Sequence, residues 1–147
     1  MNVETKVWGE VKHVVVTPSV IVSLLTVKEG TRCSRHYHKF RTNQFHVMSG
    51  RIVVELWETN EAAKLTVVVG PGCSLSVRPG LIHRFRVLES GHVVETYFAL
   101  LPQTAELSDI VRFDEGGADD LVQLRKELKA DGLLFDEWPS KTTIHSS

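Results

Sequence analysis

Short β-strand candidates recur along most of this chain and constrain its fold more than any other feature. They are rich in Val, Ile, Leu and Thr and span residues 14–27 (interrupted by Thr17-Pro18-Ser19), 33–38, 44–48, 51–57, 65–69, 73–77, 83–88 and 92–100. The turn signals that separate them are Ser49-Gly50, Thr59-Asn60, Gly70-Pro71-Gly72, Pro79-Gly80 and Ser90-Gly91. Many short strands at this spacing are typical of an antiparallel sandwich or barrel. The sequence therefore predicts an all-β fold.

The pattern changes after Gly116-Gly117. Leucines recur at the i, i+3 and i+7 spacing of one helix face, at Leu121, Leu124 and Leu128. Asp119 and Asp120 suit the first turn of such a helix, and Gly132 is a stop signal. We therefore divide the chain into a β-sheet domain over residues 1–117 and a C-terminal helix and tail over residues 118–147. We expect this second part to pack on the β-sheet domain or on a dimer partner.

Composition is that of an ordinary single-domain protein. A chain of 147 residues can bury a core, and 42% hydrophobic with 24% charged residues is usual for a globular protein. No apolar run approaches the roughly 20 residues that span a bilayer, the N-terminus does not resemble a secretory signal, and Cys33 and Cys73 provide no disulfide framework. The net charge of −1 lacks the basic footprint of a nucleic-acid binder. We expect a cytoplasmic protein that binds neither membranes nor nucleic acids.

Three histidines carry the strongest chemical signal. His36 and His38 form an H-x-H pair in an expected strand, where side chains at i and i+2 share a face. His83 follows the Pro79-Gly80 turn and shares its strand parity with apolar residues, which directs it inward. Three imidazoles that converge inside a β-structure predict a divalent metal site, with Zn, Fe, Mn and Ni all open as the ion.

The segments that carry these histidines are basic. Residues 30–54 and 62–88 contain Lys and Arg but no Asp or Glu. This distribution favours a small anionic or sugar-like ligand near the metal, although a solvated outer face would have the same composition. Arg35 and Arg41 lie close to the histidine pair in sequence and are the candidate substrate-binding residues.

The same residues resemble the two sequence motifs of the cupin family. The first motif consists of a glycine, H-x-H, a glutamate and a second glycine, and it is matched by Gly30, His36, His38 and Gly50, with Asn43 at the glutamate position. The second motif combines a P-G turn with a following histidine, and it is matched by Gly72, Pro79, Gly80 and His83. The resemblance implies a single-domain jelly-roll barrel, or double-stranded β-helix, with a metal held by His36, His38, His83 and the residue at the glutamate position.

The identity of the fourth ligand depends on strand parity. Asn43 shares parity with Phe45 and Val47 on the more apolar face, so in a regular strand Asn43 points inward and Gln44 outward. A bulge at the loop end would reverse this choice. Either amide would leave the site with no ligand charge.

Shorter segments are similar to the cupin domain of type II mannose-6-phosphate isomerases, over roughly residues 5–117. They are Val7-Trp8-Gly9, Met48-Ser49-Gly50, His83-Arg84-Phe85 and Asp109-Ile110-Val111-Arg112. This resemblance implies a metal-dependent sugar-phosphate isomerase or epimerase, for which Glu55 or Glu95 would have to supply the base. The alternatives are a non-catalytic sugar- or nucleotide-sugar-binding cupin and a metal-dependent dioxygenase. We expect a homodimer that forms through a barrel edge and the apolar C-terminal segment.

Overall fold

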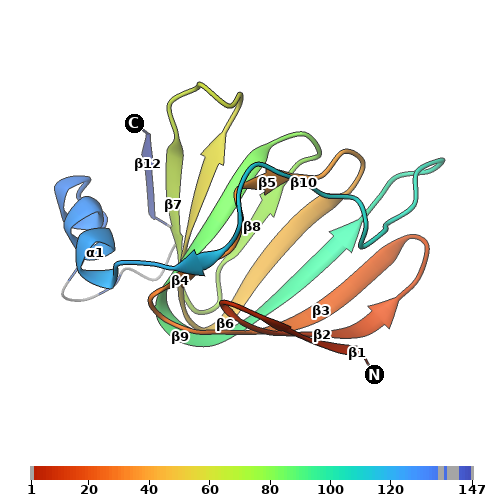
Figure 1. The fold of residues 1–147 in the computed structure, drawn as a ribbon, viewed down its shortest axis with the longest axis horizontal. Helices are drawn as coiled ribbons and strands as arrows, with labels where there is room; N and C mark the ends of the chain where they lie inside the picture. The colour runs from red at the N-terminus through yellow and green to blue at the C-terminus, as the bar shows by residue number, and fades with distance from the viewer. Residues whose placement is uncertain (1, 136–137, 139–142, 147) are drawn as a thin grey trace.

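A curled antiparallel β-sheet makes up most of the molecule (Figure 1). The computed structural model of the chain describes residues 2–135, 138 and 143–146. The main path of the sheet runs through β1 (Asn2–Lys6), β2 (Gly9–Val16), β3 (Val20–Val27), β9 (Ile82–Phe98), β6 (Thr42–Trp57), β7 (Leu65–Val69) and β12 (Thr143–Ser146). The remaining strands are β4 (Thr31–Arg32), β5 (His36–Tyr37), β8 (Ser74–Val77), β10 (Val111–Arg112) and β11 (Gly117–Ala118). The prediction of an all-β fold is confirmed.

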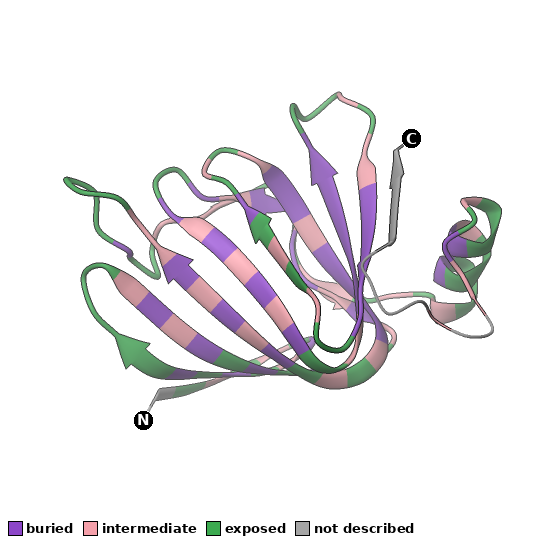
Figure 2. Ribbon diagram, turned by 180° about the vertical axis from the view of Figure 1, so that it is seen from behind, coloured by how far each residue is buried: buried purple, intermediate pink, exposed green. Residues whose placement is uncertain are grey.

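Alternation along the strands decides which face of the sheet is buried. In β3, Ile21, Ser23, Leu25 and Val27 are buried, and the residues between them are half-buried or exposed. Figure 2 shows the same alternation as bands across the neighbouring strands. The inward side chains form one core inside the curled sheet, in which Trp8 and Phe45 both lie edge-on to the Phe85 ring. The sheet therefore has an apolar concave face and a more polar outer face.

β6 and β9 are two long strands, each bent in the middle, where the sequence predicted four strands separated by turns. They pair with each other across the bends, with register shifts between Val47 and Ile52. Gly50 has a φ of +78°, and a Cβ on Gly91 would lie 2.1 Å from the Ser49 carbonyl oxygen. The prediction that turns at Ser49-Gly50 and Ser90-Gly91 separate strands was wrong, because these glycines bend a continuous strand pair.

The C-terminal helix α1 (Leu121–Ala130) lies beside the barrel and confirms the predicted helix (Figure 1). Asp120 caps its N-terminus by accepting a hydrogen bond from the Gln123 backbone N–H at 3.0 Å. Its apolar face belongs to a second core cluster of Val53, Val68, Leu88, Leu124, Leu128 and Leu133. Within the described part of the chain, no helix is long and apolar enough to cross a membrane.

Candidate metal centre

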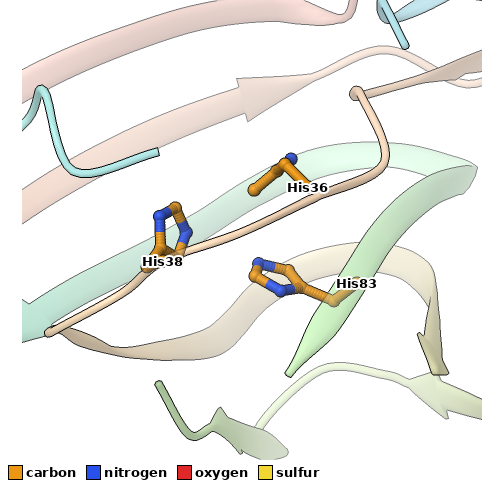
Figure 3. A group of neighbouring side chains, drawn as sticks. All are labelled: His36, His38 and His83. Atoms are coloured by element: carbon orange, nitrogen blue, oxygen red, sulfur yellow. The ribbon is translucent and has the colours of Figure 1, made fainter. Parts of the chain in front are cut away.

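His36, His38 and His83 come together on the concave side of the sheet (Figure 3). His36 lies in β5 directly opposite His83 in β9, and His38 follows β5 in the chain. The distances between the ring centroids are 5.0 Å for His36 and His38, 4.5 Å for His36 and His83, and 5.2 Å for His38 and His83. One nitrogen from each ring lies within 4.8 Å of the other two. The three histidines therefore offer three nitrogen donors to a single point.

Backbone carbonyls fix the orientation of all three rings. The Nδ1 atoms lie 2.7 Å from the Ser34 carbonyl for His36, 2.7 Å from the Asp109 carbonyl for His38 and 2.9 Å from the Leu81 carbonyl for His83. A carbonyl only accepts, so each Nδ1 carries the proton and each Nε2 keeps a free lone pair. The Nε2 atoms of His38 and His83 are buried and have no hydrogen-bond partner among the described residues. A backbone carbonyl that holds the Nδ1–H of each ring in this way orients the Nε2 atom toward a metal.

Burial keeps these imidazoles neutral. Desolvation, followed by the positive charge that His83 and His38 would carry, lowers the pKa of His36 to about 2. Desolvation and then the nearby Arg41 lower the pKa of His38 to about 3, and desolvation is also the main cause that lowers the pKa of His83 to about 4. Neutral imidazole is the form that binds metal, so the donor set fits a divalent ion.

Asn43 lies on the inner face of β6 and is fully buried, whereas Gln44 is half-buried on the outer face. The Asn43 Nδ2 donates a hydrogen bond of 3.2 Å to Glu95 Oε2. Its Oδ1 is buried and unpartnered among the described residues. The strand is regular at this point, so Asn43 is the amide that shares the face of the histidine site.

A cavity of about 780 Å³ opens beside the histidines. His36 and His38 contribute to its wall, together with the aromatic side chains Trp8, Phe45, Phe85 and Tyr97. Glu95 also lines it, is 6% exposed, and accepts a hydrogen bond from the Tyr97 hydroxyl. Burial raises the pKa of the Glu95 carboxyl above its usual range. The cavity is large enough for a small-molecule ligand and contains one buried acid.

The two candidate arginines lie in different places. Arg41 lines the cavity, is 3% exposed, stacks on the Tyr97 ring at 3.7 Å and donates a hydrogen bond to the Glu106 carbonyl. Arg35 is absent from the described lining; its guanidinium stacks on Trp57 at 4.0 Å and donates to the Asn60 carbonyl at 2.9 Å. Arg112 lines the cavity as well, and it forms no salt bridge with any described residue. The cavity thus presents two arginines, Arg41 and Arg112, to a ligand.

Comparison with known proteins identifies the fold family. The sequence profile described as Cupin domain matches residues 23–98, just over half of the chain. The chain belongs to the cupin family. A search of curated proteins found no match.

Solved structures agree with this assignment at the level of the fold. Oxalate decarboxylase from Bacillus subtilis superimposes with a TM-score of 0.63 at 17% identity, over 76% of this cupin and 30% of its own chain. The capsular polysaccharide assembling protein CapF from Staphylococcus aureus gives 0.58 at 20% identity, over 72% and 34%. The Schizosaccharomyces pombe Cnp3 cupin domain gives 0.58 at 14%, over 68% and 69%. This chain spans about a third of the length of the decarboxylase and CapF chains.

Two residues of the cupin's site were not found from the sequence. The Asp109 carboxylate accepts hydrogen bonds from the backbone N–H groups of Lys39, Phe40 and Arg41 at 2.8, 2.9 and 3.2 Å, while its carbonyl holds His38. Tyr97 shares strand parity with Glu95, which is the only local signal for its inward position. Asp109 acts across about 70 residues of chain, so no local pattern could identify its partners.

Proposed function

We propose that this cupin is a divalent-metal enzyme that acts on a small anionic hydroxycarbonyl compound, in the manner of a sugar-phosphate isomerase or epimerase. The observation that carries the proposal is a cavity lined by two histidines of the three-histidine cluster, His36 and His38, by the buried acid Glu95 and by the cations Arg41 and Arg112. The resemblance of 5–117 to the cupin domain of type II mannose-6-phosphate isomerases supports the same reaction class.

Each residue has a role in such a reaction. Arg41 and Arg112 bind the anionic group, with Arg41 held in place by Tyr97 and by the Glu106 carbonyl. A bound divalent ion would polarise the substrate carbonyl as a Lewis acid. Glu95 accepts the proton from the carbon next to that carbonyl and returns it to the neighbouring carbon, while the hydroxyl proton moves to the former carbonyl oxygen. Trp8, Phe45 and Phe85 form an apolar part of the cavity wall.

Glu95, and not Glu55, is the acid placed for this role. Glu55 is 1% exposed and is held by Lys64 and Arg84, both at 2.6 Å, and by Arg86 at 3.6 Å. It is not among the described residues that line the cavity. Of the two acids that the sequence offered, the structure therefore favours Glu95 as the proton-transfer group.

Metal loading is the first test of the proposal. Elemental analysis of the purified protein, before and after reconstitution with divalent ions, should find close to one ion per chain. His36→Ala/His38→Ala should lose that ion, whereas the control His92→Ala, an exposed histidine on the outer face, should keep it. A wild-type protein that binds no divalent ion under any of these conditions would contradict the proposed metal site.

Proton transfer is the second test. The metal-loaded protein is incubated in D₂O with a panel of phosphorylated aldoses and ketoses, and NMR follows deuterium incorporation next to the carbonyl. We expect Glu95→Gln to lower the exchange rate by about 100- to 10,000-fold, with metal still bound. Tight ligand binding without exchange would favour the non-catalytic binding cupin, and metal-dependent oxygen uptake would favour the dioxygenase.

A further inference from the structure

Asn43 and Glu95 form a buried polar pair on the neighbouring strands β6 and β9. Asn43 is 0% and Glu95 6% exposed. Glu95 Oε2 accepts the Asn43 Nδ2–H at 3.2 Å, and Glu95 Oε1 accepts the Tyr97 hydroxyl. Both carboxylate oxygens thus have a donor, while the Asn43 Oδ1 has no partner among the described residues. A buried amide oxygen left unpaired costs free energy unless it binds something.

Two neighbours of Asn43 lie close to the histidine cluster. Phe45, two residues further along the same inner face, has its ring centroid 6.4 Å from that of His83. Tyr97, the cross-strand partner of Asn43, has its ring centroid 5.8 Å from that of His38. Asn43 is therefore flanked by residues that contact two of the three metal-ligand candidates.

An amide can bind a cation through its oxygen only, because its nitrogen has hydrogens and no available lone pair. Which end of Asn43 is free depends on what occupies the other end. Glu95 Oε2 accepts the Nδ2–H of Asn43 at 3.2 Å, which occupies the nitrogen end and leaves Oδ1 without a partner among the described residues.

We propose that Glu95 is a positioning residue of the metal site, which holds the Asn43 amide so that Oδ1 becomes a fourth protein ligand beside His36, His38 and His83. This inference rests on the metal site proposed above. It assigns Glu95 a function in metal binding that is separate from proton transfer. Asn43 on β6 and Glu95 on β9 together supply an oriented fourth ligand, which Asn43 alone does not supply.

A double-mutant cycle on Co²⁺ affinity tests this inference. Asn43→Ala and Glu95→Leu should each weaken Co²⁺ binding by about 10- to 100-fold, as removal of a ligand's orienting partner does. The two losses should not add, because each removes the same ligand. The two single variants should also share one Co²⁺ absorption spectrum that differs from the wild-type spectrum. Gln44→Ala, which removes an amide from the outer face of the same strand, is the matched control. It should leave the Co²⁺ affinity and the Co²⁺ absorption spectrum unchanged.

Glu95→Gln distinguishes positioning from a general effect of the mutation. Its amide oxygen still accepts the Asn43 Nδ2–H, so this variant should recover most of the Co²⁺ affinity that Glu95→Leu loses. Circular dichroism of the metal-free proteins checks folding, and Glu95→Met replaces Glu95→Leu if the latter does not fold.

Three results would overturn the inference while leaving the metal site intact: unchanged affinity in Asn43→Ala, additive losses in the double variant, or Glu95→Gln as weak as Glu95→Leu. A wild-type protein that binds no Co²⁺ would overturn the metal site and this inference together.

Discussion

At the scale of single residues, two buried glutamates in the same sheet have opposite surroundings. Cations surround Glu55, and although burial alone would raise its pKa, the hydrogen bond and charge of Lys64 together with Arg84 lower it. Burial raises the pKa of Glu95, and Tyr97 and Asn43 only partly oppose this. Glu55 is thus held in an ion network, whereas Glu95 faces the cavity as a weaker acid suited to proton transfer.

Glu55→Gln should destabilise the fold in a pH-dependent way. We expect a loss of about 3 kcal/mol in the free energy of unfolding at pH 7, because Arg84 keeps a largely buried charge without its carboxylate partner. The folded-state pKa of Glu55 lies below its ordinary value of 4.5, so its stabilisation is complete above that pH and declines as pH falls through the folded-state pKa. Urea denaturation from pH 7 to pH 3 should show the difference from wild type shrinking.

The control for this substitution is Glu58→Gln, since Glu58 forms an ion pair with Arg78 in which both side chains are more than half exposed. It should cost less than about 1 kcal/mol at every pH. A loss in Glu55→Gln that stays constant down to pH 3 would contradict the assignment of a lowered pKa to Glu55.

Sequence reasoning finds site residues when their signal is local. The two-residue spacing of His36 and His38, and the strand parity of His83, were sufficient to bring these three together. Parity likewise placed Asn43 inside and Gln44 outside. The partners that orient them were not predictable, because the Asp109 carbonyl on His38 and the Glu95 carboxylate on Asn43 depend on contacts 71 and 52 residues apart.

At the scale of elements, β9 connects the site to the rest of the fold. Its first half carries His83 toward the site, and Arg86, three residues further on, joins the strand to helix α1. The Arg86 guanidinium lies 2.6 Å from Asp119 and 2.7 Å from Glu127, which is on the helix itself. A single cation therefore holds the start and the middle of the helical segment against the sheet.

Arg86→Met should loosen helix α1. Asp119 and Glu127 lose their main partner, and we expect a loss of about 3–5 kcal/mol in the free energy of unfolding, as for a broken buried ion pair. In hydrogen exchange measured by mass spectrometry, the substitution should accelerate exchange in Leu121–Ala130 more than in β6. Arg78→Met, in the exposed pair with Glu58, is the control and should change neither quantity appreciably. Unaltered exchange in the helix would show that the apolar cluster around Leu124 and Leu128 is sufficient to hold it.

Element types were easier to predict than their continuity. Strand alternation and the leucine spacing of the helix are local patterns, and both gave the right element types, although the strand expected over residues 33–38 covers only His36–Tyr37. Ser49-Gly50 and Ser90-Gly91 look like ordinary turns in the sequence, yet each lies opposite the other in a bent strand pair. Only the pairing of β6 with β9 distinguishes a bend of this kind from a chain reversal. β1 was missed because Val3 is its single apolar residue, so it lacks the apolar, β-branched run of the other strands.

At the scale of the whole molecule, the outer face formed by β3, the second half of β9 and the first half of β6 has no charged side chain. Its members are Val20, Val22, Leu24, Thr26, Thr42, Gln44, His46, Met48, His92, Val94, Thr96 and Phe98. Met48 is 59% and Leu24 44% exposed. Apart from its charged flank at Glu10 and Lys12 in β2, this is the surface composition of an interface centre, where charged residues are depleted. The apolar C-terminal residues Leu133, Leu134 and Trp138 instead pack within the chain's own second core cluster.

We therefore expect the homodimer to form through this uncharged face, since two copies can meet there about a two-fold axis without repulsion between like charges. Light scattering coupled to size exclusion should give twice the chain mass of 16.5 kDa. Leu24→Glu places a negative charge near the middle of this face in both copies, so that like charges meet across the two-fold axis. This variant should be monomeric. Val122→Glu, an apolar-to-acid change at a residue of helix α1 that is 65% exposed, should remain dimeric. A monomeric wild type, or a Leu24→Glu variant that remains dimeric, would contradict this interface.

Because Leu24 points away from the histidine site, the monomeric variant should bind metal as the wild type does, which separates assembly from the chemistry of the cavity.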